Sequence, residues 1–261
     1  MTSESNEHYG GDMLAMLQAI WGRGFLSPGG EDEIGRLIGD GDLAGASVLD
    51  IGSGAGGAAV ALIRNHGAGY VTGIDVEDTV INYARALVAD EKLLGRIGFV
   101  KAAPGPLPFP PQTFDIVFSK DSLVHIPEKG PLMAEVFRVL KPGGRFIASD
   151  WLINHDGPPS PEMAAYIAAE DLGFGMTSPD GYAKAMQDAG FVLVSTTSRN
   201  AWYHQLAIDE LSRMQGDVGR IAAAEVGQAF VDRNIKTWSM MLPVLASGEH
   251  CPTHLHATRP R

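Results

Sequence analysis

The sequence predicts an α/β fold in which a mostly parallel sheet is wound by helices on both faces. Three observations carry this prediction. Short apolar segments typical of buried strands alternate with longer segments of helical periodicity between residues 47 and 151. The first strand ends in a glycine-rich turn that leads into a helix. Successive strands are separated by segments long enough for a helical crossover, and such crossovers join parallel strands.

We expect strand and helix to alternate through the core and the remainder of the chain to be mainly helical. The expected strands are Ser47–Ile51, Tyr70–Asp75, Ile97–Lys101, Phe114–Ser119, Gly144–Trp151, Phe191–Ser198 and Thr253–Thr258, which gives a seven-stranded sheet. The expected helices run from Met13 to Gly22 and over Glu31–Ile38, Gly57–His66, Thr79–Glu91, Lys129–Leu140, Glu162–Leu172, Gly181–Ala189, Tyr203–Gln215 and Ile221–Leu245. Residues 1–45 are expected to form a helical cap. Residues 46–261 form the main domain, whose segments 152–190 and 200–247 cover the substrate as helical lid insertions.

Composition excludes several classes of protein. The formal net charge is −11, from 20 Lys and Arg against 31 Asp and Glu, and no basic run interrupts this excess. A nucleic-acid or anionic-membrane partner is therefore not expected. The single cysteine cannot form an internal disulfide, and no apolar run approaches membrane-spanning length. The polar N-terminus lacks the apolar core of a signal peptide, so we expect a cytoplasmic protein.

The turn after the first strand is the expected ligand site. Gly52 and Gly54 flank Ser53, and glycine allows a ligand to lie against the backbone. The spacing of Gly52, Gly54 and Gly57 also fits dinucleotide-binding turns. However, Asp50 would repel a diphosphate and would accept a hydrogen bond from an ammonium group. S-adenosylmethionine (SAM) carries an ammonium group and no phosphate, so we predict a SAM site; the structural alternative is a turn that only packs a helix on a strand.

Other polar residues are expected at the same edge of the sheet. Asp50, Asp75, Ser119 and Asp150 all fall at strand ends, where ligands of open α/β sheets bind. An acid at the position of Asp75 binds ribose hydroxyls in nucleoside-binding folds. The structural alternative is that Asp75 only caps the N-terminus of the helix that follows.

Asp121 and His125 are the candidate catalytic residues. They are four positions apart, so on a helical turn they would share one face. A carboxylate that holds an imidazole fixes its tautomer and raises its basicity, and His125 would then act as a general base. A packed histidine with Asp121 as a cap is the structural alternative. His250, Cys251, His254 and His256 match no standard zinc spacing, so no metal is expected.

Four motifs together resemble the class I SAM-dependent methyltransferases, which have a Rossmann-like fold. They are Asp50-Ile-Gly-Ser-Gly54, Gly73-Ile-Asp75, Phe114-Asp-Ile-Val-Phe-Ser-Lys-Asp-Ser-Leu-Val-His125 and Leu140-Lys-Pro-Gly-Gly144. Within that class the chain is most similar to small-amine N-methyltransferases, namely those of phosphoethanolamine and of sarcosine and dimethylglycine. The resemblance implies SAM as cofactor, with S-adenosylhomocysteine as product, and Asp121 and His125 as the catalytic pair.

The resemblance also implies further cofactor contacts. Tyr9, Leu26 and Ser27 match positions that close over SAM in the phosphoethanolamine enzymes, and Val76 follows the ribose-binding acid. Family members carry an Asp after the third strand, where this chain has Ala102 and Ala103. The adenine contact is therefore expected from the backbone there or from elsewhere.

The expected acceptor is a small cationic amine without a phosphate group. Between Phe146 and Ala183 the chain holds acids and aromatics but no Lys or Arg, and carboxylates and aromatic faces suit a cation. The expected substrate-binding residues are Trp151, Tyr166, Glu170, Tyr182 and Tyr203, with Glu170 as the counter-charge. The phosphate-binding Arg of the phosphoethanolamine enzymes aligns with Glu170. An O-, S- or C-methyltransferase and a non-catalytic SAM-binding module remain open as alternatives.

Overall fold

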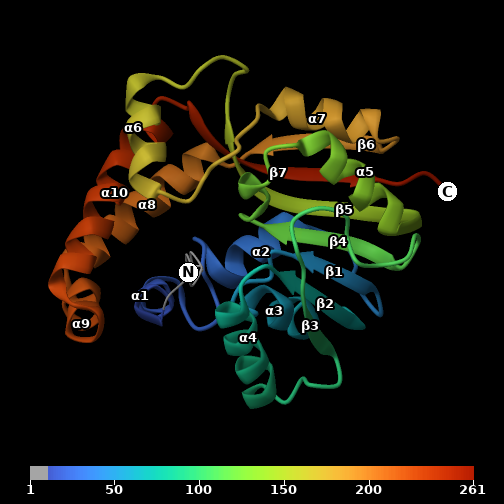
Figure 1. Ribbon diagram of the computed structural model, residues 1–261, viewed down its shortest axis with the longest axis horizontal. Helices are drawn as coiled ribbons and strands as arrows, with labels where there is room; N and C mark the ends of the chain where they lie inside the picture. Colours follow the sequence, from blue (N-terminus) through green and yellow to red (C-terminus); the bar gives the residue numbers. More distant parts are fainter. Residues whose placement is uncertain (1–10) are drawn as a thin grey trace, which may run out of the picture.

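A seven-stranded sheet forms the centre of the molecule (Figure 1). The computed structural model describes residues 11–261. The strand order is β3-β2-β1-β4-β5-β7-β6; β1 to β5 are parallel, and β7 is antiparallel to both β5 and β6. The strands are β1 Ser47–Ile51, β2 Tyr70–Asp75, β3 Ile97–Lys101, β4 Phe114–Lys120, β5 Leu140–Ile153, β6 Val192–Ser198 and β7 His250–Thr258. The expected doubly wound, mostly parallel sheet is confirmed.

Helices cover both faces of the sheet because the central strands are apolar on both faces. Val48 packs with residues of α2 (Gly30–Ile38), α3 (Gly57–Arg64) and α4 (Asp78–Asp90). Its neighbour Leu49 belongs to the opposite core, which includes residues of α5 (Lys129–Val139) and α7 (Pro179–Asp188). Successive strand residues point to opposite faces, so two neighbouring apolar residues fill two cores. The short helix η1 (Leu123–His125) follows β4.

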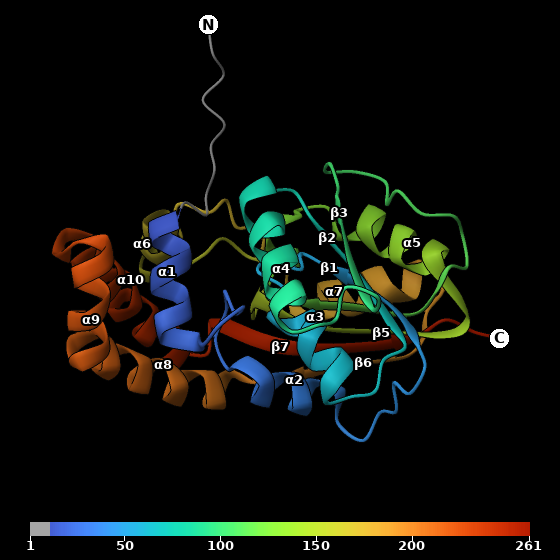
Figure 2. The same ribbon diagram turned by 90° about the horizontal axis from the view of Figure 1, so that it is seen from below.

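The remaining helices form a third apolar core at one end of the sheet, on the left in Figures 1 and 2. They are α1 (Gly11–Trp21), α6 (Pro161–Glu170), α8 (Asn200–Gln215), α9 (Asp217–Val226) and α10 (Gln228–Ala246). The expectation of one helix over Ile221–Leu245 is wrong. Gly227 has a φ of 87° and separates α9 from α10, since this backbone conformation cannot continue a right-handed helix.

A buried carboxylate joins three helices of this third core. Glu210 on α8 accepts hydrogen bonds from the indole N–H groups of Trp21 on α1, at 2.6 Å, and Trp238 on α10, at 3.1 Å. Burial raises the pKa of Glu210 to about 7. The first helix of the expected N-terminal cap is thereby fixed to the helices that follow the sheet.

The histidines of β7 have structural partners. Glu33 of α2 is fully buried and binds the guanidinium of Arg199, at 3.0 and 2.8 Å, and Nε2 of His254, at 2.7 Å. Burial would raise the pKa of Glu33, but the hydrogen bonds from His254 and Arg199 lower it below its ordinary value. His256 contacts the carbonyl of Leu37. Within residues 11–261, no cluster of side chains is arranged to hold a metal ion, and no helix is long and apolar enough to cross a membrane.

Candidate active site

The glycine-rich turn after β1 is held by the backbone of β2. The N–H groups of Gly52 and Ser53 both donate to the carbonyl of Ile74, at 2.9 and 3.0 Å. Gly52 has a φ of 71°, and a Cβ added there would lie 2.1 Å from Oγ of Ser122. Only glycine satisfies both the conformation and the close approach. The turn therefore brings the segment after β4 directly against the end of β1.

Asp50 is buried at the end of β1 with an unsatisfied oxygen. Its side chain is 1% exposed, and Oδ2 has no hydrogen-bond partner among residues 11–261. Burial, together with the negative charge of Asp75, raises its pKa to about 7. Buried polar groups without partners are rare because desolvation is costly. An ammonium donor would supply the missing hydrogen bond, and the Oγ of Ser53 in the same turn is also unpartnered.

Asp75 stabilises the turn as well as facing the cavity. Its Oδ2 accepts from the N–H of Gly54 at 2.9 Å, and its Oδ1 accepts from the N–H groups of Val76 at 2.8 Å and Glu77 at 3.2 Å. Burial raises the pKa of Asp75 despite these bonds. The carboxylate thus orients the glycine turn and the entry to α4, and it lines the cavity described next.

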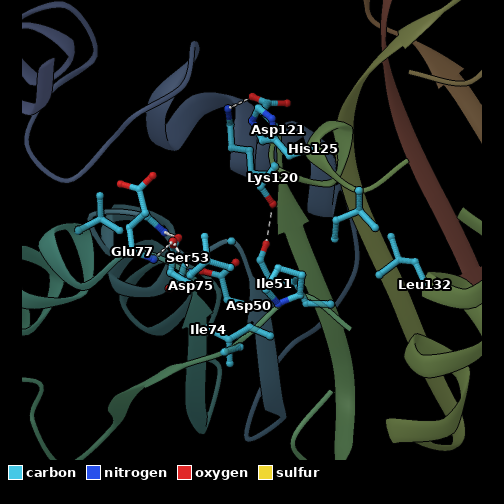
Figure 3. Close-up of a pocket in the computed structure, with 18 of the residues that line it drawn as sticks. Asp50, Ile51, Ser53, Ile74, Asp75, Glu77, Lys120, Asp121, His125 and Leu132 are labelled. Carbon is cyan, nitrogen blue, oxygen red and sulfur yellow. Dashed lines mark hydrogen bonds and ion pairs between the residues drawn. The ribbon is translucent and has the colours of Figure 1, made fainter. Parts of the chain in front are cut away.

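A cavity of about 890 Å³ lies beyond the carboxyl ends of the parallel strands. The expected cofactor residues that line it are Leu26, Ser27, Asp50, Gly52, Ser53, Gly54, Asp75, Val76, Ala102 and Ala103. In Figure 3, Asp50, Ser53 and Asp75 lie together at the glycine turn, whereas Lys120, Asp121 and His125 lie at another side of the pocket.

Two expected cofactor residues differ from the rest. Ser119 does not line the cavity, because its hydroxyl lies beneath the turn and donates to the carbonyl of Ile51 at 2.7 Å. The same hydroxyl lies 2.9 Å from Oγ of Ser122, so Ser119 stabilises the turn through hydrogen bonds and does not face the cavity. Tyr9 lies outside the described residues.

Asp121 and His125 both line the cavity, and the side-chain hydrogen bonds that the structure gives Asp121 go to Lys120, Ser149 and Tyr203. The helical spacing does not apply, since Asp121 has a φ of 58° and η1 begins only at Leu123. The carboxylate of Asp121 instead accepts from Nζ of Lys120 at 2.5 Å and from Oγ of Ser149 at 2.8 Å. Nδ1 of His125 lies 3.0 Å from the carbonyl oxygen of Leu172.

The comparisons with known proteins agree with this geometry. Residues 49–148 match the family model of a methyltransferase domain. Together with the strand order and the cavity, this match decides the family. The chain carries a class I SAM-dependent methyltransferase domain.

Its relatives transfer methyl groups to different kinds of atom. A phosphoethanolamine N-methyltransferase of Triticum aestivum is 30% identical over 240 residues, which are 90% of this chain and 46% of that protein. A sterol 24-C-methyltransferase of Neurospora crassa is 34% identical over 180 residues, 64% of this chain and 46% of that protein. The chain therefore spans about half the length of these curated relatives.

A solved structure shows the same fold over nearly the whole chain. It is Haemonchus contortus phosphoethanolamine N-methyltransferase 2 in complex with phosphomonomethylethanolamine and S-adenosylhomocysteine. The TM-score is 0.87 at 24% identity, and the match covers 98% of this chain and 59% of that one.

The expected substrate residues of the methyltransferase domain lie behind the cavity, and none of the five lines it. Tyr182 is fully buried, and its hydroxyl donates to Oδ2 of Asp150 at 2.9 Å. The hydroxyl of Tyr203 lies 3.4 Å from Oδ2 of Asp121. Trp151 packs on the ring of Tyr203, with ring centres 5.1 Å apart. The structure thus places these three aromatics as support for Asp121, which follows β4, and for Asp150, which lies within β5.

Tyr166 and Glu170 lie behind His125. Tyr166 is 3% exposed, and burial raises the pKa of Glu170, which lies one helical turn further along α6. The ring of Phe174 lies 6.4 Å from Tyr166 and 5.7 Å from His125, between centroids. Because Glu170 does not line the cavity, the structure gives no support to its expected role as counter-charge.

Sequence reasoning missed Lys120. Its side chain is buried against Asp121 and lines the cavity. The signal was present in the sequence, since Lys120 ends an apolar strand between two residues already expected in the site. A lysine is buried in such a place only when it is paired.

Proposed function

We propose that this chain binds SAM and transfers its methyl group to the nitrogen of a small cationic amine. The observation that carries the proposal is the buried Asp50, whose unpartnered Oδ2 lies at the glycine turn of the cavity. Asp50 would accept a hydrogen bond from the ammonium group of SAM, and Asp75 would accept from the ribose hydroxyls. Val76 and the backbone at Ala102 and Ala103 would contact the adenine side.

When bound, SAM supplies an electrophilic methyl group on a sulfonium centre. The protein must align the acceptor nitrogen in line with that methyl group and keep the nitrogen unprotonated. A carbonyl oxygen can only accept a hydrogen bond, so the contact with Leu172 places the proton of a neutral His125 ring on Nδ1. The lone pair then lies on Nε2, which supports His125 as the general base. In this arrangement the Leu172 carbonyl fixes the tautomer, the role first expected of Asp121.

The charges of the cavity favour a cationic acceptor. Six carboxylates line it in the described chain, from Asp50, Asp75, Glu77, Asp121, Glu128 and Glu135. Lys120 is the one Lys or Arg of residues 11–261 among the lining residues, and its ammonium already donates to three protein oxygens. An ammonium has three N–H donors, so Lys120 has none left for a phosphate. Arg199 does not line the cavity, and its guanidinium is bound to Glu33.

A matched pair of acceptors tests this proposal. N-Methylethanolamine and its phosphate ester present the same amine and differ only in the phosphate, and a diamine adds a second positive charge. We expect saturable methylation of the phosphate-free amines, with kcat/KM about 10-fold or more above that of the phosphate ester, because one unfavourable charge contact contributes about 1.4 kcal/mol or more. The measurement is mass spectrometry of the products. A clear preference for the phosphate ester would show that the acceptor assignment is wrong.

A further inference from the structure

Lys120 connects two parts of the cavity. Its Nζ donates to Oγ of Ser27 at 2.7 Å, to the carbonyl of Pro28 at 2.7 Å and to Oδ2 of Asp121 at 2.5 Å. The side chains of Lys120 and Asp121 are 4% and 1% exposed. All donors of the ammonium are used, so its bonds are internal to the protein.

The first partner of Lys120 is a loop that covers the cavity. We call residues 22–29 the cover loop. Leu26 and Ser27 of this loop line the cavity, and the carbonyl of Gly24 accepts from the N–H of Gly57 in the glycine-rich turn at 2.9 Å. Gly22, Gly24 and Gly29 all have positive φ, at 94°, 86° and 89°. Glycine loses more conformational freedom on ordering than other residues, so the loop needs attachments such as Lys120 to stay closed.

The second partner is Asp121, whose backbone is in the left-handed region, with a φ of 58°. This conformation is uncommon for a residue other than glycine and needs support from its surroundings. Ser149 supplies part of that support: its carbonyl accepts from the N–H of Asp121 at 2.7 Å, and its hydroxyl donates to Oδ1 at 2.8 Å. Lys120 provides the charged partner on the other carboxylate oxygen, Oδ2.

We propose that Lys120 is a positioning residue that couples closure of the cover loop to the orientation of Asp121. The inference rests on the proposed function in that the cover loop closes on the cofactor side and Asp121 lies on the acceptor side. When the loop is closed, Ser27 and Pro28 hold the ammonium, and the ammonium holds the carboxylate. Opening the loop removes two of the three acceptors of a buried cation, so loop position and Asp121 orientation change together.

Lys120→Met tests the coupling, because it keeps the length of the side chain and removes its charge and donors. Hydrogen exchange of the unliganded protein is expected to become about 10-fold faster or more in residues 22–29, since loss of charged hydrogen bonds lowers the local opening free energy. Strands β1 and β5 should keep wild-type exchange. In the wild type, SAM should also protect residues 119–125, and Lys120→Met should lose most of that protection.

The kinetic readout separates positioning from simple folding. Lys120→Met should raise KM for SAM and lower kcat, Lys120→Arg should restore both in part, and the matched variant Lys141→Met, at the opposite end of the sheet, should change neither. Wild-type exchange in residues 22–29 of a folded Lys120→Met variant would overturn the inference. If that variant fails to fold, Ser27→Ala replaces it: faster exchange of the loop supports the coupling and unchanged exchange overturns it. Failure of the wild type to bind SAM would count against the proposed function alone, because loop exchange without ligand is measured independently.

Discussion

Replacing His125 with alanine is expected to lower turnover by about 10²–10⁴-fold, the usual contribution of a general base, with little change in SAM affinity. The imidazole lies at another side of the pocket than Asp50 (Figure 3), and its Nδ1 contacts the Leu172 carbonyl. Its loss should therefore remove proton acceptance and leave the cofactor contacts in place. The measurements are steady-state kinetics with a saturating amine and calorimetry with SAM.

The matched control for this variant is His204→Ala. His204 is on α8 and does not line the cavity, so the turnover of His204→Ala should equal that of the wild type. The kinetic effect of His125→Ala should also shrink at high pH, where more of the amine is already unprotonated. Turnover close to wild type at neutral pH would mean that His125 is structural and that another group accepts the proton.

The second large effect is expected at Asp50. Asp50→Asn should weaken SAM binding by about 10–150-fold, because a hydrogen bond to a charged group contributes about 1.5–3 kcal/mol. The pKa of Asp50 is raised to about 7, and only the ionised carboxylate attracts the ammonium. Wild-type affinity should therefore rise with pH through about 7, and the variant should lack this component of the pH dependence. Calorimetry between about pH 6 and pH 8 measures both effects.

Stability separates this loss of binding from loss of fold. The folded-state pKa of Asp50 lies above its ordinary value of 3.8, so the folded protein holds this proton more tightly than the unfolded chain does. The free energy of unfolding therefore falls as the pH rises from about 4 to about 7. At pH values above about 7, unliganded Asp50→Asn should be at least as stable as the wild type. Asp188→Asn, which is exposed on α7, is the matched control. Equal SAM affinity in Asp50→Asn and the wild type would remove Asp50 from the site.

The parts of the fold that local patterns determine could be predicted from the sequence. β1, β2 and β3 have the expected bounds, because short apolar runs bounded by polar or glycine-rich segments mark the strands of such a sheet. For the same reason Asp50 and Asp75 lie where the strand ends place them. The antiparallel insertion of β7 between β5 and β6 depends on long-range pairing, which no local pattern contains.

The details of the acceptor side could not be predicted in the same way. Spacing places Asp121 and His125 four residues apart, but the left-handed backbone at Asp121 turns its carboxylate to Lys120 and Ser149. Tyr182 and Glu170 likewise have residue types that suit a substrate site. Whether such side chains face a cavity or a core depends on tertiary contacts, such as the hydrogen bond from Tyr182 to Asp150.

The most direct test of the central claim uses SAM with an isotopically labelled methyl group. The protein is incubated with labelled SAM and a metabolite extract, and the small-molecule products are identified by mass spectrometry, with His125→Ala as the matched reaction. The account predicts a labelled methyl group on the nitrogen of a small, phosphate-free amine, formed by the wild type and strongly reduced in the variant. A label on carbon or oxygen, or no labelled product despite measurable SAM binding, would contradict it.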